Sequence, residues 1–422
     1  MNEILSFWAQ WLRPSAGLPT VQWSLLLAVA AMAGYLTQRH TGLPKVLGYS
    51  LVGTAAGLAG FSGAVWPLQG IGLFLLELGL AIVLFECGGR IPLRWFRHNP
   101  MVLVQSIAES VLTYFAVYWV LVWLNLPTQV AGPLALVALA ASPAVLTRVV
   151  ADTRAAGPVT ERAIVLTTLS SLYALTLGSA RAELLNRQSV TVLETISPVV
   201  VVLGVSIIVA AVLALVLRMA LRVMSPTSEN TSMLFLALVA AGTAVAAHMG
   251  GSAPLAALLA GMLLKQLNPR PWAWPRQLGN ASSLLTMLMF VLVSTVAAQA
   301  DWSAHVAGVV LALITVRLLA KAVGVALGNV GSGASWKQAL WVGCAMTPMS
   351  SIALLIASQF VLASPSTGHV IAGVALPAIL LMEVLGSVIA TVAIYRAGES
   401  SKPWAALTSP GNNNNGDTGR ES

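Results

Sequence analysis

Charged residues are scarce in this sequence. Asp, Glu, Lys and Arg make up only 9% of its 422 residues, whereas 57% are hydrophobic. A soluble domain carries about a quarter of charged residues, so a soluble fold is excluded. Apolar runs long enough to cross the roughly 30 Å hydrocarbon core of a bilayer recur along most of the chain. The sequence therefore predicts an all-α polytopic membrane protein with the lipid bilayer as a partner.

Groups that carry enzymatic chemistry are also few. The two cysteines, Cys87 and Cys344, lie in apolar runs and indicate neither a disulfide framework nor a metal site. The three aspartates, Asp152, Asp301 and Asp417, lie in loops or in the tail, which argues against an intramembrane aspartyl protease. No histidine lies at the depth of the serines in the spans, so a serine nucleophile has no base within reach. We predict that the protein is not an enzyme and uses no cofactor.

The apolar runs divide the chain into three regions. Residues 1–20 are predicted to form an N-terminal periplasmic segment, residues 21–396 a transmembrane domain, and residues 397–422, with four consecutive asparagines, a disordered cytoplasmic tail. The domain contains thirteen predicted spans, whose approximate limits are 21–38, 43–60, 69–89, 101–124, 129–149, 161–180, 195–221, 232–248, 252–267, 279–300, 305–328, 336–361 and 369–395.

Basic residues are distributed unevenly between the two sides of these spans. Of the 22 Lys and Arg residues, 17 fall on the side reached after the first span, three on the other side, and Arg317 and Lys321 within a span. Cytoplasmic loops of membrane proteins are rich in Lys and Arg. The bias predicts an outside N-terminus and a cytoplasmic C-terminus in a bacterial inner membrane. It also accounts for the net charge of +8 without a nucleic-acid partner.

Two predicted spans are interrupted near their centres by a hydroxyl residue and a proline, Ser142-Pro143 and Thr347-Pro348. Proline has no N–H and clashes with the preceding turn, so a helix does not pass through it unchanged. The freed backbone groups persist in a bilayer only where protein or a wet cavity satisfies them. The two spans run in opposite directions, and a matched pair of breaks is the sequence sign of a transporter's binding site. We predict two crossed discontinuous helices with all four residues at the substrate site.

Charged side chains within spans are functional candidates, because a bilayer makes them costly. Arg317 and Lys321 are four residues apart and share a helix face, and Arg317 and Glu383 lie midway through their spans, where the two can pair. A structural ion pair or a snorkelling side chain is the alternative, which we favour for Glu86 and Glu109 because they lie closer to the inner span ends. The residues considered for charge and proton coupling are Glu383, Arg317, Lys321, Glu77 and Glu86.

Motifs along residues 40 to 395 resemble the monovalent cation:proton antiporter superfamily, the Na⁺/H⁺ exchanger and Kef-type group. The resemblance implies an inverted-repeat bundle in which a core domain with crossed broken helices moves against a dimerising scaffold domain, so a homodimer is expected. The matching motifs are Leu43-Pro44-Lys45-Val46-Leu47-Gly48-Tyr49 with Gly53 and Gly57; Glu77-Leu78-Gly79, Leu84-Phe85-Glu86 and Gly88-Gly89; Ser142-Pro143-Ala144-Val145; Gly250-Gly251-Ser252 with Ala257 and Leu259-Ala260-Gly261; Lys321 with Gly324; and Thr347-Pro348.

One departure from the family pattern concerns the span after the first broken helix. In the family this span carries an aspartate that binds the cation and the proton in competition, whereas here the stretch contains Ser170 and Ser171. A hydroxyl can ligate a cation but does not titrate near neutral pH. The resemblance then implies that Lys321 has lost its partner, that exchange is weak or absent, and that remaining coupling uses Glu383.

The leading interpretation is a secondary active transporter that exchanges Na⁺ or K⁺ for protons by alternating access, with Ser170 and Ser171 in place of the usual aspartate. Two alternatives stay open. Two unpaired cations at the midplane favour a transporter of a small anionic solute. Loss of the titrating aspartate favours a membrane scaffold or sensor that keeps the fold without transport.

Overall fold

The structure is a computed structural model that describes residues 19–61, 70–91, 96, 99–185, 192–225, 228–268, 276–300, 302–330 and 332–401. The predicted disordered tail lies outside these residues except for 397–401, and so does the predicted periplasmic segment up to residue 18. The helices of the described residues are α2 (Pro19–Thr41), α3 (Lys45–Leu58), α4 (Gly70–Gly89), α6 (Pro100–Trp123), α7 (Thr128–Leu139), α8 (Pro143–Thr153), α9 (Pro158–Leu184), α10 (Val192–Val223), α11 (Glu229–His248), α12 (Ala253–Leu267), α13 (Arg276–Ala297), α14 (Ala304–Leu327), α15 (Trp336–Ala345), α16 (Ser351–Ala363) and α17 (Pro365–Arg396).

These helices form the predicted bundle of membrane segments. Within the described residues, nine helical segments are long and apolar enough to cross a membrane by themselves. Counting α7 with α8 and α15 with α16 as interrupted segments, the described helices make thirteen, the number predicted. Among the nine segments, Ile196–Val223 of α10 has the highest mean hydropathy, 3.2, and is only one-third buried. Its exposed apolar side chains include Val200, Ile208 and Val212, as expected of a lipid-facing helix.

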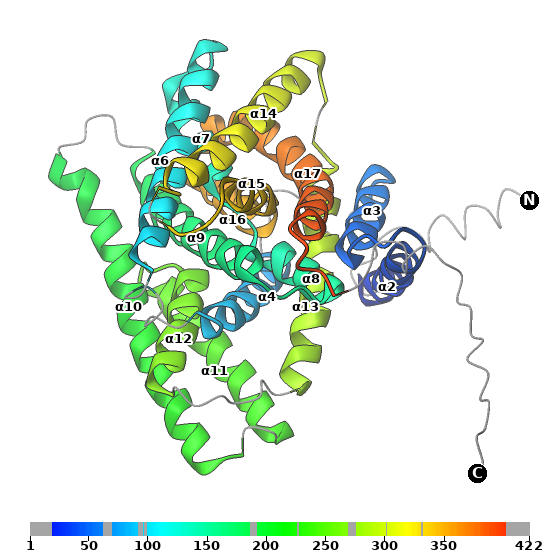
Figure 1. Cartoon of the computed structure of the whole chain (residues 1–422), viewed down its shortest axis with the longest axis vertical. Helices are drawn as coiled ribbons and strands as arrows, with labels where there is room; N and C mark the ends of the chain where they lie inside the picture. Colours follow the sequence, from blue (N-terminus) through cyan, green and yellow to red (C-terminus); the bar gives the residue numbers. More distant parts are fainter. Residues whose placement is uncertain are drawn as a thin grey trace, which may run out of the picture.

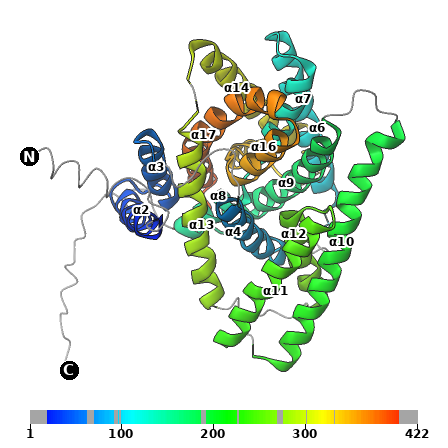
Figure 2. The same ribbon diagram turned by 180° about the vertical axis from the view of Figure 1, so that it is seen from behind.

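The packing of the helices reveals two inverted repeats. Helix α3 packs on α13 and α4 packs on α12, α7 packs on α17 and α15 on α9, while α6 packs directly on α14. This pattern maps α3, α4, α6, α7/α8 and α9 onto α12, α13, α14, α15/α16 and α17. Each repeat carries its broken helix in fourth place. In Figures 1 and 2, α15, α16 and α9 lie in the middle of the bundle, and α10 runs along one edge.

Helices α6 and α14 approach each other closely because two glycines face α6, Gly324 in α14 and Gly328 directly after it. A Cβ atom at Gly324 would lie 2.5 Å from the Cα of Glu109, and one at Gly328 would lie 2.6 Å from the Cα of Gln105. Small residues allow this approach between membrane helices. The contact brings the polar residues of α6 next to the cationic residues of α14.

The segment after α17 is attached to the start of α9. The Glu399 carboxylate accepts hydrogen bonds from the backbone N–H groups of Val159 and Thr160, each at 2.7 Å, and from the Thr160 hydroxyl. A carboxylate at a helix N-terminus satisfies free N–H groups and interacts favourably with the helix dipole.

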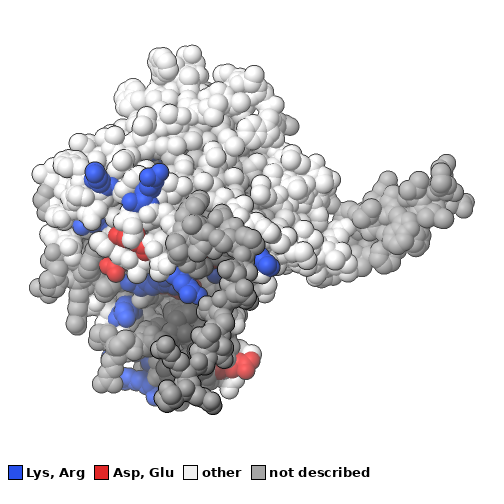
Figure 3. Space-filling model, turned by 45° about the vertical axis from the view of Figure 1, so that its right-hand side comes forward, with Lys and Arg blue, Asp and Glu red and all other residues white. Residues whose placement is uncertain are grey.

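Charged side chains on the face shown in Figure 3 gather in one region, and a large uncharged surface lies beside it.

Candidate functional site

The two interrupted segments meet at their breaks. The Ser142 N–H donates a hydrogen bond to the carbonyl of Pro348 at 2.9 Å, which joins the first break directly to the second. The Ser142 hydroxyl accepts a hydrogen bond from the Val145 N–H at 3.3 Å and so caps α8. Pro143 occupies the first turn of α8, where a missing N–H costs nothing. The residues at the predicted substrate site are therefore side by side in the centre of the bundle.

Arg317 fills the space between the C-terminal ends of α7 and α15. Its guanidinium group donates to the carbonyls of Ala138 and Ala140, at 2.7 and 2.8 Å, and to those of Thr347 and Pro348. The side chain is fully buried. Helix C-termini carry partial negative charge and free carbonyls, and a guanidinium group satisfies both with its rigid fork of donors. Four backbone carbonyls at the two breaks therefore accept hydrogen bonds from a cationic side chain of the protein itself.

Lys321 lies one turn further along α14 and forms an ion pair with Glu109 of α6. The Lys321 Nζ donates to Glu109 Oε1, to the Leu139 carbonyl at 3.3 Å and to the Ser170 hydroxyl at 3.4 Å. Both side chains of the pair are fully buried. The expectation that Lys321 lacks a carboxylate partner is therefore wrong. The carboxylate comes from α6, which precedes the first broken helix, and not from α9, which follows it.

Glu109 is the residue whose position sequence reasoning misjudged. Two more hydroxyls bind its carboxylate: Ser110 Oγ donates to Oε2 at 3.1 Å and Thr113 Oγ1 donates to Oε1 at 3.2 Å. Counting residues along one span placed Glu109 towards the inner end, but this count did not reveal where α14 crosses α6. The glycine at position 324, three residues after Lys321, is the sequence signal of that crossing.

Ser170 and Ser171 line the crossing from α9. Ser170 Oγ donates to the Leu139 carbonyl at 2.9 Å, and Ser171 Oγ donates to the carbonyls of Thr167 and Ala141, at 2.7 and 3.1 Å. Both hydroxyls therefore satisfy backbone groups, including carbonyls freed by the first break. Only Ser170 also contacts the ion pair.

Glu383 of α17 does not pair with Arg317, so that expectation is wrong. Its Oε1 accepts a hydrogen bond from the Ser50 hydroxyl of α3 at 2.9 Å. The guanidinium group of Arg317 instead donates hydrogen bonds to backbone carbonyls at the two breaks. Glu383 is fully buried beside the second break: a Cβ at Gly386, in the next turn of α17, would lie 2.7 Å from the Cα of Pro348.

The other two predicted coupling glutamates lie on α4 and do not reach the crossing. Glu86 forms an ion pair with Arg90 at 2.6 Å near the end of the helix and accepts a hydrogen bond from Ser282. Glu77 is partly buried and has no hydrogen-bond partner among the described residues. Within these residues, no hydrogen bond joins either carboxylate to Arg317 or Lys321.

Comparison with known proteins identifies the family. Residues 27–396 match the model of the sodium/hydrogen exchanger transmembrane domain. The chain belongs to the sodium/hydrogen exchanger family. The resemblance inferred from the sequence motifs is thereby confirmed, and the protein is a membrane protein of a family of antiporters. No curated protein matches the chain in sequence.

Solved structures of a sodium proton antiporter share the fold of this exchanger. A structure of the sodium proton antiporter MjNhaP1 from Methanocaldococcus jannaschii at pH 8 superimposes with a TM-score of 0.67 at 16% identity, over 90% of this chain and 98% of that chain. An electron-microscopy structure of the same antiporter gives 0.70 at 17% identity, over 91% and 97% of the two chains. These similarities confirm the fold of the exchanger.

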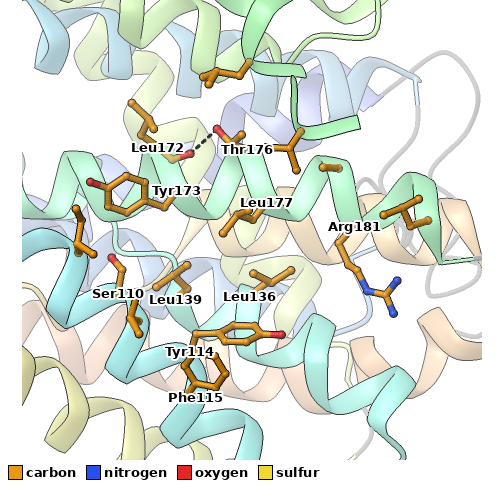
Figure 4. A pocket seen from close by; sticks show the side chains of 16 residues that line it. Ser110, Tyr114, Phe115, Leu136, Leu139, Leu172, Tyr173, Thr176, Leu177 and Arg181 are labelled. Carbon is orange, nitrogen blue, oxygen red and sulfur yellow. Dashed lines mark hydrogen bonds between the residues drawn. The ribbon is translucent and has the colours of Figure 1, made fainter. Parts of the chain in front are cut away.

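A cavity of about 640 Å³ lies beside the residues that contact the ion pair of the exchanger. Helices α6, α7, α9 and α10 line it with mostly apolar side chains. Ser110 and Leu139, which bind the two members of the pair, lie in its wall, and Figure 4 shows Arg181 at the opposite end from Ser110 and Tyr173. The cavity therefore extends along α9 from the crossing towards the C-terminal end of that helix.

Proposed function

We propose that this exchanger moves a monovalent cation, Na⁺ or K⁺, in exchange for protons by alternating access, and that Glu109 supplies the carboxylate for this exchange. One observation carries the proposal: the carboxylate of Glu109 is fully buried at the crossing of the broken helices, and its charged partner is Lys321. The function then needs no aspartate on α9. The missing group is supplied from another helix.

Competition for Glu109 is the proposed exchange step. When a cation binds the carboxylate, the ammonium group of Lys321 loses its counter-charge. A buried ammonium without a partner is strongly unfavourable, so Lys321 releases its proton to water. When the cation leaves, Lys321 takes up a proton and pairs with Glu109 again. One cation is gained for each proton lost, and the buried charge stays balanced.

Oxygen atoms around Glu109 are suitable ligands for a hard monovalent cation. The Ser170 hydroxyl and the Leu139 carbonyl both lie within hydrogen-bonding distance of the Lys321 Nζ, the place that the cation would take. In this proposal Ser170 is an ion ligand. The other predicted site residues have a structural role in this proposal. They form the two breaks and fix the hydrogen-bond partners of the carbonyls there: Ser142, Pro143, Ser171, Thr347 and Pro348.

Access to the pair is proposed to alternate by movement of the repeats against α10. The cavity lies between α10 and the helices that carry the site, so a shift of those helices along α10 would close it. The family fold and the lipid-facing surface of α10 support this view. A homodimer, an outside N-terminus and a location in a bacterial inner membrane belong to the same proposal.

The two alternatives, a transporter of an anionic solute and a scaffold without transport, have less support from the structure than from the sequence. An anionic solute was favoured by two unpaired cations, but Lys321 is paired with Glu109 and Arg317 with four carbonyls. A scaffold without transport was favoured by the loss of a titrating carboxylate at the crossing, but Glu109 lies there.

Proteoliposomes test the proposal. The purified protein is reconstituted with a pH-sensitive dye inside, a pH gradient is imposed, and Na⁺, K⁺ or choline is added outside. We expect Na⁺ or K⁺ to dissipate the gradient, choline to have no effect, and Glu109→Gln to abolish the response. Glu161→Gln, at an exposed carboxylate in the first turn of α9, is the matched control and should behave as wild type. Absence of exchange in the wild type would support the scaffold alternative.

A further inference from the structure

Glu383 is a buried carboxylate without a charged partner in the described structure. Its side chain is fully buried, its Oε1 accepts one hydrogen bond from Ser50, and its Oε2 has no partner among the described residues. A buried carboxylate oxygen without a partner is expensive. The exchange step proposed for Glu109 does not use Glu383, so this group needs a separate explanation.

Two further hydroxyls face the same carboxylate and are themselves unsatisfied. Ser294 of α13 and Ser350, which precedes α16, both lie close to the Glu383 carboxylate. Both hydroxyls are buried and have no hydrogen-bond partner among the described residues. Ser350 is the N-cap residue of α16, yet its side chain makes no capping hydrogen bond. Oxygen atoms from α3, α13 and the residue before α16 thus surround the Glu383 carboxylate of α17, and of the three hydroxyls Ser50 alone makes a well-formed hydrogen bond to it.

This arrangement suits a cation better than a hydrogen-bond network. Ligand oxygens around a hard cation lie about 2.4 Å from the ion, and therefore further from each other than hydrogen-bonded atoms do. Both cationic side chains of α14 are engaged elsewhere, Arg317 by carbonyls and Lys321 by Glu109. When the Glu383 carboxylate is ionised, no cationic side chain of the described residues therefore balances its charge.

We propose that Glu383 and the hydroxyls of Ser50, Ser294 and Ser350 form a second ion site, which holds one dehydrated monovalent cation such as Na⁺ beside the second break. A single carboxylate neutralises one positive charge, so a divalent ion would leave a buried charge unpaired. The ligands are hard oxygens, and the described residues contain no cluster of His, Cys, Asp and Glu that would hold a transition metal.

The position of the site suggests what the bound cation does. Ser350 belongs to the second break, and Gly386, in the next turn of α17 after Glu383, packs on Pro348 of the same break. A cation here would tie α3, α13 and α17 to the extended segment before α16. The bound cation would stabilise the second break, and its binding does not depend on the proposed exchange.

Thermal unfolding of the purified full-length protein in detergent tests this site. The Tm is measured against rising NaCl, KCl or LiCl, with choline chloride keeping the ionic strength constant. To remove binding at Glu109, the experiment uses Glu109→Gln/Lys321→Gln, in which the first pair is neutral. We expect a saturable rise in Tm with at least one of the three cations, and its loss when Glu383→Gln is added.

Two serine variants make the test specific. Ser350→Ala keeps the carboxylate but removes a ligand, and it should raise the half-saturating cation concentration about tenfold. Ser387→Ala, on the same helix as Glu383 but with its hydroxyl bonded to the Val384 carbonyl, should leave it unchanged. Size-exclusion profiles and the Tm in choline alone verify that each variant is folded.

Two results would overturn the second site: no cation-specific rise in Tm before Glu383→Gln is added, or a rise that persists after it. Failure of the proposed exchange gives a different pattern. Wild-type liposomes would then show no transport, while the rise in Tm that depends on Glu383 would remain.

Discussion

The ammonium group of Lys321 donates a hydrogen bond to the carboxylate of Glu109, although the two residues are 212 positions apart in the sequence. Their helices, α6 and α14, occupy equivalent places in the two inverted repeats and pack directly on each other. The ion pair therefore lies between the two repeats and beside both breaks. A carboxylate is present at the crossing even though α9 carries only serines there.

The buried pair should behave as a unit in stability measurements. Removing one partner leaves an uncompensated buried charge, so Glu109→Gln or Lys321→Gln alone should lower the free energy of unfolding by about 3–5 kcal/mol. The double variant removes both charges and should recover most of that loss. Denaturant unfolding in detergent measures the cycle. Additive losses in the double variant would show that the two side chains do not interact.

Arg317 should not tolerate replacement by lysine. A lysine ammonium group lacks the planar fork that reaches the carbonyls of both α7 and α15. Arg317→Lys should therefore leave carbonyls of the two breaks without donors and cost at least about 3 kcal/mol of stability. Arg148→Lys is the matched control, because within the described part of the chain Arg148 binds the hydroxyls of Ser283 and Thr286, at 2.9 and 3.2 Å, and no backbone carbonyl. Equal losses for the two variants would argue against a special role for Arg317.

The close contact between α6 and α14 can be tested with one methyl group. A Cβ at Gly324 would lie 2.5 Å from the Cα of Glu109, whereas one at Gly308, on the same helix, meets nothing within 4 Å. Gly324→Ala should push the helices apart, displace Glu109 from Lys321, and reduce both the Tm and the exchange rate. Gly308→Ala should leave both unchanged. A harmless Gly324→Ala would mean that the two helices are further apart in the protein.

The proposed topology predicts the location of the segment after α17. Reporter domains fused after residue 396 should be active only in the cytoplasm, because the loop charge bias places this end inside. The start of α9 lies on the same side, since Glu399 binds Val159 and Thr160. A fusion that is active outside would contradict both the orientation and the opposed directions of the two broken helices.

The sequence predicted the fold more successfully than the partners of the charged residues. Apolar runs, prolines and loop charges are local signals, and they revealed the thirteen segments and both broken helices. The partners of Arg317, Lys321 and Glu383 depend on which helices cross and at what height, and no local pattern encodes that. Depth along each span matches Arg317 to Glu383 and places Glu109 near a span end, because depth alone carries no information on which helices touch. The tilt and close packing of α6 and α14 decide the actual pair.

Glu109 of α6 is proposed to take over the function of the missing α9 aspartate, because its carboxylate lies at the same crossing. Cation-dependent proton flux in proteoliposomes tests it most directly, with a carboxylate moved from α6 to α9. Glu109→Gln should reduce the flux by about 100-fold or more, since it removes the counter-charge of Lys321. Adding Ser170→Asp should restore much of the flux, because Ser170 Oγ lies 3.4 Å from the Lys321 Nζ. Adding Ser171→Asp should not, because that hydroxyl binds the carbonyls of Thr167 and Ala141. Wild-type flux in Glu109→Gln, or rescue by Ser171→Asp but not by Ser170→Asp, would contradict the account.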